Sequence, residues 1–307
     1  MRALPLLCAL VLTGSAWAQP QPQPQKVDLR PIWKVGQASR YRIVQTEQTV
    51  AQMRGLGEPQ KSTTQIEAVV AWEVLEVHEA GGGSARMSIE SIQFKISDAQ
   101  GQSRTITADS ADEATQSLRQ YIAALSGAAV TVTVGPDGQV ASVQGHEAVR
   151  ARAGEIGQKL DEGFFRDIAR DLAVLTGGGA SVEPSGKWQH TNSSHHPIGQ
   201  LRQSYTDELR GVEMLAGLPV AIIERRGELS LEPDLSGRPA DAPPLELRVT
   251  EADYAAQLFF DLSRHELVGS QAQQTLELEV TITTPRGALV QSIREVTRTQ
   301  VLRISER

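Results

Sequence analysis

Alternating apolar and polar residues recur in two parts of the chain, at 39–98 and at 200–305, and predict long β-strands there. In the first half, the strand-like runs cover residues 39–54, 62–78 and 85–98, and glycine-rich turns at 55–59 and 81–83 separate them. The second half continues the pattern in five further runs: 200–210, 218–231, 245–261, 266–284 and 292–305. These runs exceed the usual strand length of about 5–6 residues. They predict a large, strongly curved antiparallel sheet.

Two of the runs indicate how this sheet is covered. In the run 62–78, Val70 and Trp72 fall on one face while Val69 and Leu75 fall on the other. A strand that is apolar on both faces is typical of a central strand covered on both sides. In contrast, residues 276–282 alternate apolar side chains with glutamates and threonines, which predicts a strand with one solvated face.

Two segments between the strand-rich blocks have helical periodicity. Residues 109–127 and 147–175 carry apolar side chains at three- and four-residue steps. Ser110 followed by Glu113 is a capping box for the first segment, and Gly127 is placed to end it. The second segment contains glycines that each cost up to about 1 kcal/mol relative to alanine, so we expect a broken helix or two short helices there. These glycines are Gly154, Gly157 and Gly163.

A tight hairpin is predicted between the helical segments. Valine-rich stretches flank a Pro-Asp-Gly turn at 136–138, where proline fixes its own φ and glycine supplies a positive φ. The whole pattern predicts an α+β fold: a large curved antiparallel sheet or incomplete β-barrel with two helical segments packed on its concave face. We expect a single β-rich domain at 39–307 with a central helical insert at about 109–176.

The first residues predict that the protein is exported. Arg2 precedes an apolar run at 4–12, and an Ala-Trp-Ala site at 16–18 follows, which is the pattern of a secretory signal peptide. The apolar run is shorter than the roughly 20 residues that span a bilayer. We therefore predict a cleaved signal peptide at 1–18, a Gln/Pro-rich spacer and lead-in at 19–38, and a periplasmic or extracellular location.

Composition excludes several classes of function for the exported chain. Cys8 is the only cysteine and lies inside the signal peptide, so the mature chain has no disulfide, zinc–thiolate site or cysteine nucleophile. The mature chain has 29 basic and 37 acidic side chains, a net charge of −8, and no basic cluster beyond pairs. Nucleic-acid binding and polybasic membrane binding both need such a cluster. No transmembrane segment is expected in the mature chain.

Three histidines form the most conspicuous group of possible metal ligands. His190, His195 and His196 lie close together in a polar segment, and neutral imidazole is a common ligand of zinc and copper. Adjacent histidines on a strand point to opposite faces, and no nearby carboxylate completes a set. We therefore interpret the segment as a polar surface loop between strands and predict no metal site.

Other candidate chemistry is equally weak. Asp167 and Asp171 share a helix face with Arg166 and Arg170 as neighbours, which is typical of a solvated, charged surface. Ser84 lacks the glycine pattern of a nucleophile elbow, and the glycine runs lack the lysine of a phosphate loop. The sequence therefore predicts no catalytic, cofactor-binding or metal residues, no cofactor, and a protein that is not an enzyme.

Several scattered features form one pattern: Tyr41, the valine-rich hairpin at 135–138, Pro184 with Trp188, Tyr205, and the run Phe259, Phe260 and Asp261. With these features the chain resembles a domain-of-unknown-function family of exported, β-rich bacterial envelope proteins. Its plan is similar to that of half-barrel lipoprotein carriers. The resemblance implies an extracytoplasmic β-rich fold and supplies no activity.

Two hypotheses for the function follow. The first is a non-catalytic extracytoplasmic envelope protein that binds a partner protein or serves structurally. The alternative is a periplasmic carrier that holds a hydrophobic ligand or lipid between sheet and helices, with the glycine-interrupted helical segment as a movable lid.

The predicted signal peptide is tested by mass spectrometry of the exported protein. We expect a mature chain that begins at Gln19, because the Ala-Trp-Ala site places cleavage after Ala18. A different N-terminus, or a lipid attached to Cys8, would contradict this prediction.

Overall fold

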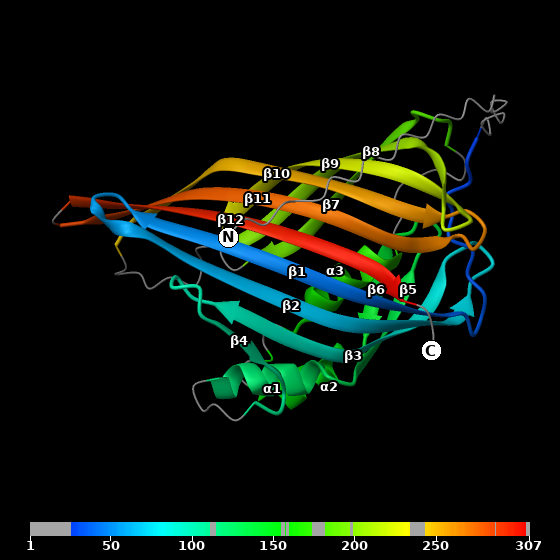
Figure 1. The fold of residues 1–307 in the computed structure, drawn as a ribbon, viewed down its shortest axis with the longest axis horizontal. Coiled ribbons are helices and arrows are strands. Elements are labelled where there is room, and N and C mark those ends of the chain that lie inside the picture. The colour runs from blue at the N-terminus through cyan, green and yellow to red at the C-terminus, as the bar shows by residue number, and fades with distance from the viewer. Residues whose placement is uncertain are drawn as a thin grey trace, which may run out of the picture.

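Twelve antiparallel strands form one open sheet in the described part of the chain (Figure 1). The structure is a computed structural model that describes residues 26–110, 115–154, 157, 160–173, 182–196, 199–233, 243–285 and 287–304. The strands are β1 (Ala38–Met53), β2 (Leu56–Val77), β3 (Gly83–Ser97), β4 (Ser103–Ile106), β5 (Ala128–Val134), β6 (Val140–Gln144), β7 (Lys187–His196), β8 (Gly199–Leu215), β9 (Leu218–Pro233), β10 (Leu245–Asp261), β11 (Glu266–Thr284) and β12 (Gly287–Ile304).

The two ends of the described chain meet in the middle of the sheet. The strand order is β6-β5-β3-β2-β1-β12-β11-β10-β9-β8-β7, and β4 pairs with β3. Strand β1 pairs with β12 along nearly its full length, from Arg40 opposite Ile304 to Met53 opposite Gln291. This pairing joins the strands of the first half to those of the second half.

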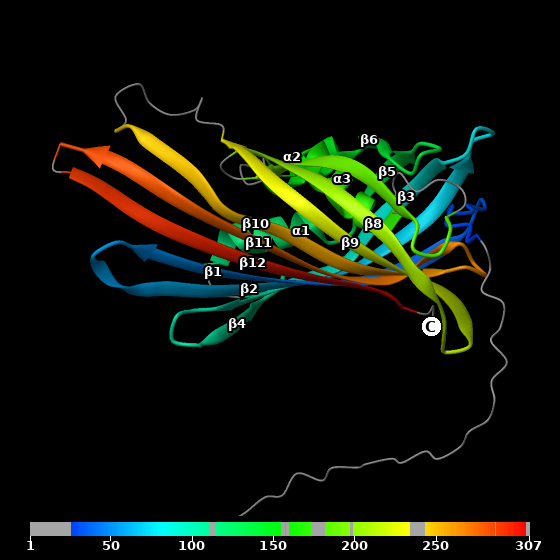
Figure 2. The same cartoon turned by 90° about the horizontal axis from the view of Figure 1, so that it is seen from above.

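The sheet curves around its helices. Figure 2 shows α1 (Gln116–Leu125), α2 (His146–Ala153) and α3 (Glu162–Ala173) on the concave side. Helix α3 contacts β5 and β6 near one edge of the sheet and β7 at the other edge. The predicted α+β fold, with a curved antiparallel sheet and helices on its concave face, is confirmed. None of the helices in the described residues has the length and apolar character needed to span a bilayer.

The helical segments follow the prediction in part. Gly154, with φ of 62°, ends α2, so the second segment forms two short helices as expected. The first helix begins only at Gln116, and the Ser110 hydroxyl accepts a hydrogen bond from the Thr107 amide at 2.9 Å. Glu113, the other half of the predicted capping box, lies outside the described residues.

The expectation that both faces of β2 are covered is wrong. Val70 and Trp72 are buried on the concave side, but Val69 and Leu75 are only half-buried and Val77 is 42% exposed. Strand β2 lies between β1 and β3, so it is central within the sheet as predicted. Its other apolar residues lie on the convex face of the sheet, which the helices do not cover (Figure 2).

The first predicted turn is shorter than expected. Strand β2 starts at Leu56, opposite Met53, so Arg54 and Gly55 alone make the turn, and Gly55 has φ of 78°. A positive φ at the turn suits a two-residue hairpin. Pro59 fits inside the strand because β3 pairs with β2 only from Thr63 onward, so the missing N–H is tolerated on the free flank.

The lead-in before β1 packs on the core. Val27 forms an isolated β-bridge with Val182, Leu29 is buried, and the Trp33 ring meets the Trp72 ring edge-on at 5.9 Å. These contacts cover one end of the concave side. The predicted signal peptide and the Gln/Pro repeat, at 1–25, lie outside the described residues.

Three apolar clusters lie in the described part of the fold. The largest packs the helices against the sheet and includes Phe165 of α3 and Phe260 of β10, and a small one joins Phe94 of β3, Ile106 of β4 and Ile122 of α1. We name the remaining one the leucine cluster. It consists of five buried leucines of β8, β9 and β11: Leu201, Leu229, Leu231, Leu276 and Leu278.

Candidate functional site

A cavity of about 240 Å³ lies between α3 and the concave face of the sheet, and we name it the chamber. Its lining combines charged, amide and hydroxyl side chains with a few apolar ones. The lining residues are Gln45, Arg170, Asp171, Leu201, Gln203, Tyr205, Arg225, Tyr254, Ala256, Leu258, Ser270, Ala272, Gln274, Thr297, Thr299 and Val301. Strand alternation explains this set, because every second residue of a strand points to the same face.

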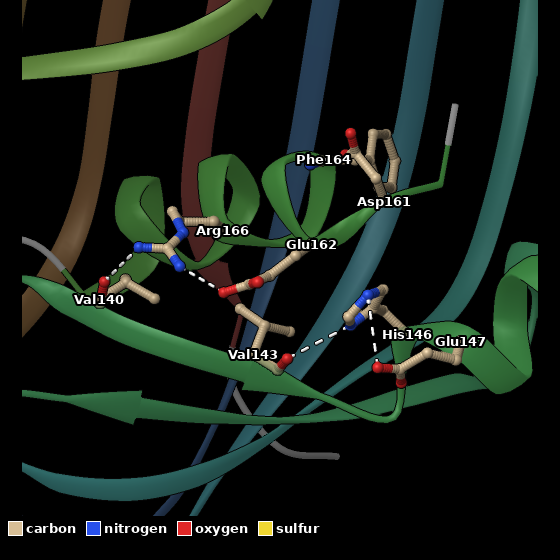
Figure 3. Close-up of polar contacts among 8 residues, drawn as sticks. All are labelled: Val140, Val143, His146, Glu147, Asp161, Glu162, Phe164 and Arg166. Carbon is tan, nitrogen blue, oxygen red and sulfur yellow. Dashed lines mark hydrogen bonds and ion pairs between the residues drawn. The ribbon is translucent and has the colours of Figure 1, made fainter. Parts of the chain in front are cut away.

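Helix α3 is fixed to the edge strand β6 by polar contacts (Figure 3). The Arg166 guanidinium donates a hydrogen bond to the Val140 carbonyl at 2.9 Å and pairs with Glu162 one turn earlier. Asp161 begins the helix by accepting a hydrogen bond from the Phe164 amide at 3.0 Å, as N-cap residues do. These contacts set the rotation of α3, which places Arg170 and Asp171 at the chamber.

A buried ion pair stands on the sheet side of the chamber. Arg225 of β9 lies opposite Asp207 of β8 and donates two hydrogen bonds to its carboxylate, at 2.7 and 2.9 Å. Asp207 is entirely buried and Arg225 almost so. Bidentate geometry is the strongest form of such a pair, so these two charges neutralise each other inside the fold.

Two tyrosines pack beside this pair because the residue between them is glycine. Tyr205 and Tyr254 flank Gly227 on neighbouring strands, and their rings meet at 4.9 Å. A Cβ at Gly227 would lie 2.6 Å from the Tyr205 ring, so only glycine leaves room for this contact. The Arg225 guanidinium lies 5.2 Å from the Tyr205 ring centroid, a cation–π arrangement. Burial raises the pKa of Tyr205, and it raises that of Tyr254 to about 12.

His190 lies behind the tyrosines on β7. Its side chain is 6% exposed, its ring lies 5.0 Å from that of Tyr205, and its Nδ1 is 3.8 Å from the Asp207 carboxylate. That nitrogen has no hydrogen-bond partner among the described residues. Burial lowers the pKa of His190 to about 4, and the nearby Arg225 charge acts in the same direction. His190 is therefore neutral at neutral pH.

The two aspartates of α3 have different surroundings. Asp167 pairs with Arg170 at 2.9 Å, yet burial raises its pKa to about 6. The Asp171 side chain is exposed, and the surface that it exposes lines the chamber. Desolvation by the surrounding fold raises its pKa, which Arg170 and Arg225 oppose. Helix α3 turns these residues toward the inside of the curved sheet, so the interpretation as an outer solvated surface is wrong for Asp167 and Arg170, whereas Asp171 is exposed as expected.

Of the wider depressions in the described residues, two border the strands that form the chamber. One, of about 830 Å³, lies among β6, α3 and β7–β8 and shares Arg170 and Gln203 with the chamber lining, so it adjoins the chamber. The other, of about 650 Å³, involves outward-facing residues such as Arg226, Gln273 and Arg298. The outer depression lies on the open surface of the sheet, whereas the chamber lies between the sheet and α3.

The predicted loop around the histidines is a strand. Residues 187–196 form β7, an edge strand whose polar sequence lacks the apolar alternation of the other strands. His190 points inward, while the side chains of His195 and His196 lie outside the described residues. Within the described ranges no group of three or more His, Cys, Asp or Glu side chains is placed to hold a metal ion. Ser84 lies at the start of β3, directly after the glycine-rich turn that was predicted at 81–83.

The carrier hypothesis placed a ligand between sheet and helices, but the sequence did not identify the residues that line the chamber. Arg225 and Tyr254 are single polar residues within strands and belong to no motif, and Tyr205 was named only for the family resemblance. One signal was available: Arg225 falls on the same strand face as Ile223 and Leu229, and a charged residue on an apolar face needs a partner inside the fold.

Comparison with known proteins assigns no family. No family model and no curated protein matches the chain. Similar solved structures include lipovitellin, described for its lipid–protein interactions, at 11% identity and a TM-score of 0.46. The match covers 93% of this chain and 26% of the lipovitellin chain, so this chain spans about a quarter of that length.

Two further solved structures are more distant. A DUF1329 family protein from Desulfovibrio piger has 10% identity and a TM-score of 0.13, with 84% of each chain covered. Pseudomonas aeruginosa OpdQ has 8% identity and a TM-score of 0.21, with coverage of 88% of this chain and 100% of that one. At these scores none of the three assigns the chain to a family, and we take no function from them.

His190 makes the stability of the protein sensitive to acid. The unfolded histidine has a pKa near 6.5 and the folded one about 4. Between these values only the unfolded chain binds the proton, so stability is lost as the pH falls through this range. At pH 5 the loss is about 2 kcal/mol relative to pH 7.5. His190→Gln should remove this loss in urea denaturation, while His78→Gln, a half-buried histidine outside the chamber, should keep it. Equal pH dependence in both variants would contradict the assignment.

The Arg225–Asp207 pair is tested by removing one partner and then both. Arg225→Met leaves a buried carboxylate without its partner, which should cost about 3–5 kcal/mol in the free energy of unfolding. The double variant Asp207→Leu, Arg225→Met should be closer to the wild type, since no isolated charge remains. Arg226→Met, at the exposed neighbour, should change stability by less than about 0.5 kcal/mol. A loss below about 1 kcal/mol for Arg225→Met would show that the pair is not buried.

Proposed function

We propose that the protein is a non-catalytic extracytoplasmic binding protein that holds a small molecule in the chamber between the sheet and α3. The observation that carries this proposal is the chamber itself, where polar side chains of α3 and six strands face a partly enclosed space. Sequences that only need a stable core fill such a position with apolar residues. Polar groups kept inside require partners, and a ligand can supply them.

The lining suits a molecule with both polar and apolar parts. Gln45, Gln274 and Thr297 offer hydrogen bonds, while Leu258 and Val301 offer apolar contact. Leu201 and Tyr254 line the chamber and also belong to the leucine cluster or pack against it. The apolar cluster thus continues from the chamber wall. This arrangement supports a carrier of a small amphipathic ligand, a more polar ligand than the lipid that the sequence suggested.

The chemistry of the lining supports binding rather than catalysis. Tyr205 and Tyr254 stay protonated because their pKa values are raised, and His190 stands behind them rather than on the chamber wall. Ser270, Thr297 and Thr299 have no hydrogen bond to a basic side chain among the described residues. Nucleophilic catalysis needs such a contact to activate the hydroxyl.

Two considerations support the remaining parts of the proposal. The pattern of a signal peptide at 1–18 supports an extracytoplasmic location. We prefer a small molecule to an envelope protein as the partner because the chamber is enclosed on two sides, whereas the outer depression is open sheet surface. Small-molecule sites are typically concave and formed before the ligand binds.

Filling the chamber tests the proposal. Ala256 lines it, and the neighbouring Ala255 is exposed on the outer face, so Ala256→Phe and Ala255→Phe add the same bulk to opposite sides of β10. After gentle purification from the native host, native mass spectrometry should show a bound small molecule on the wild type and on Ala255→Phe. It should be missing from Ala256→Phe.

Thermal stability is the control for the two variants. Both variants should unfold at a temperature near that of the wild type, which thermal denaturation checks. If the wild type carries no ligand, and no compound in a library of small amphipathic molecules stabilises it more than Ala256→Phe, the chamber is not a binding site.

A further inference from the structure

We infer that the chamber selects molecules that carry a positively charged nitrogen, and that Asp171 is the group that binds this nitrogen. The inference rests on the proposed function and specifies the class of its ligand. It comes from the charges on the chamber wall, from how they are paired, and from the remaining lining.

Of the charged groups around the chamber, one carboxylate has no arginine partner. Arg225 is held by both oxygens of Asp207, and Arg170 pairs with Asp167 at 2.9 Å. Asp171 therefore has no arginine to itself. The two arginines and three aspartates give this region a net charge of −1.

The surroundings of Asp171 are those of an incomplete ion pair. Its carboxylate has no hydrogen bond or ion pair within the part of the chain that the structure describes, and its exposed surface faces the chamber. Its raised pKa agrees with this, since burial penalises a charge that the nearby arginines compensate only in part. A cation in the chamber would stabilise the ionised form.

The rest of the lining can hold the other parts of such a molecule. Gln45, Gln274 and Thr297 carry oxygens that accept hydrogen bonds from an ammonium group. Tyr254 adds an aromatic ring, whose face attracts cations. The volume of about 240 Å³ is below the roughly 300–1,000 Å³ of sites for drug-sized ligands, so the ligand is a small amine rather than a long-chain lipid.

An anionic ligand is the main alternative, because two guanidinium groups line the chamber. Each of these groups already has a carboxylate partner at hydrogen-bond distance. An anion would have to compete with Asp167 or Asp207 and would also face Asp171. The negative charge of Asp171 repels an anion that enters the chamber.

Three probes of nearly equal shape separate these alternatives. Benzylammonium, benzyl alcohol and benzoate differ mainly in charge, and their dissociation constants can be measured by NMR titration of the intact mature protein. We expect benzylammonium to bind the wild type about tenfold more tightly than the other two, or more, as charge-assisted hydrogen bonds allow. Asp171→Asn should remove that preference. Asp253→Asn, which removes an exposed charge elsewhere on β10, should retain it.

The outcomes distinguish this inference from the proposed function. If benzoate binds best, or if Asp171→Asn keeps the preference for benzylammonium, the inference is overturned. The binding function then still stands, provided that Ala256→Phe blocks the probe that binds. If no probe binds the wild type in a way that Ala256→Phe weakens, the inference fails as well, and the chamber test described above then decides the proposed function independently.

Discussion

The fold depends on covering the concave face of one very wide sheet. An open sheet of this width has two edges and one apolar face that must be removed from water. Helix α3 covers part of the apolar face by packing Phe165 into the core, and it also contacts both edge strands, β6 and β7. Its bond from Arg166 to Val140 also occupies a carbonyl at the edge of the sheet. The chamber and the position of Asp171 both follow from that placement.

Apolar and polar groups occupy different parts of the concave side. The large apolar cluster packs the helices at one part, the leucine cluster fills another, and the chamber lies against both. Buried charges such as Asp207 and Arg225 add little stability over apolar residues of similar size. Folding alone therefore does not require this pair, which stands beside the chamber rather than among the groups that we assign to the ligand.

The sequence predicted the regular parts of the fold well, and it suggested a ligand between sheet and helices without predicting the polar lining of the chamber. Long alternating runs located most strands, and Gly154 and the turn at 135–138 marked real breaks. Periodicity within a segment cannot report which way a helix faces in the folded chain. Asp167 and Asp171 therefore suggested a solvated surface, although α3 turns them inward. The polar strand β7 was missed for a related reason: its partner β8 defines it, since its own sequence has no apolar alternation.

The pairing of β1 with β12 has a consequence for how the chain folds. These two strands are separated by almost the whole described sequence, yet they form the seam between the halves of the sheet. A ribosome releases β1 first and β12 last, so the central seam closes only after synthesis of the final strand. Contacts between such distant residues slow folding, because a long loop must close before they form. Until then each half exposes an unpaired central strand, so the newly made protein is open to wrong pairings at the position that later becomes its middle.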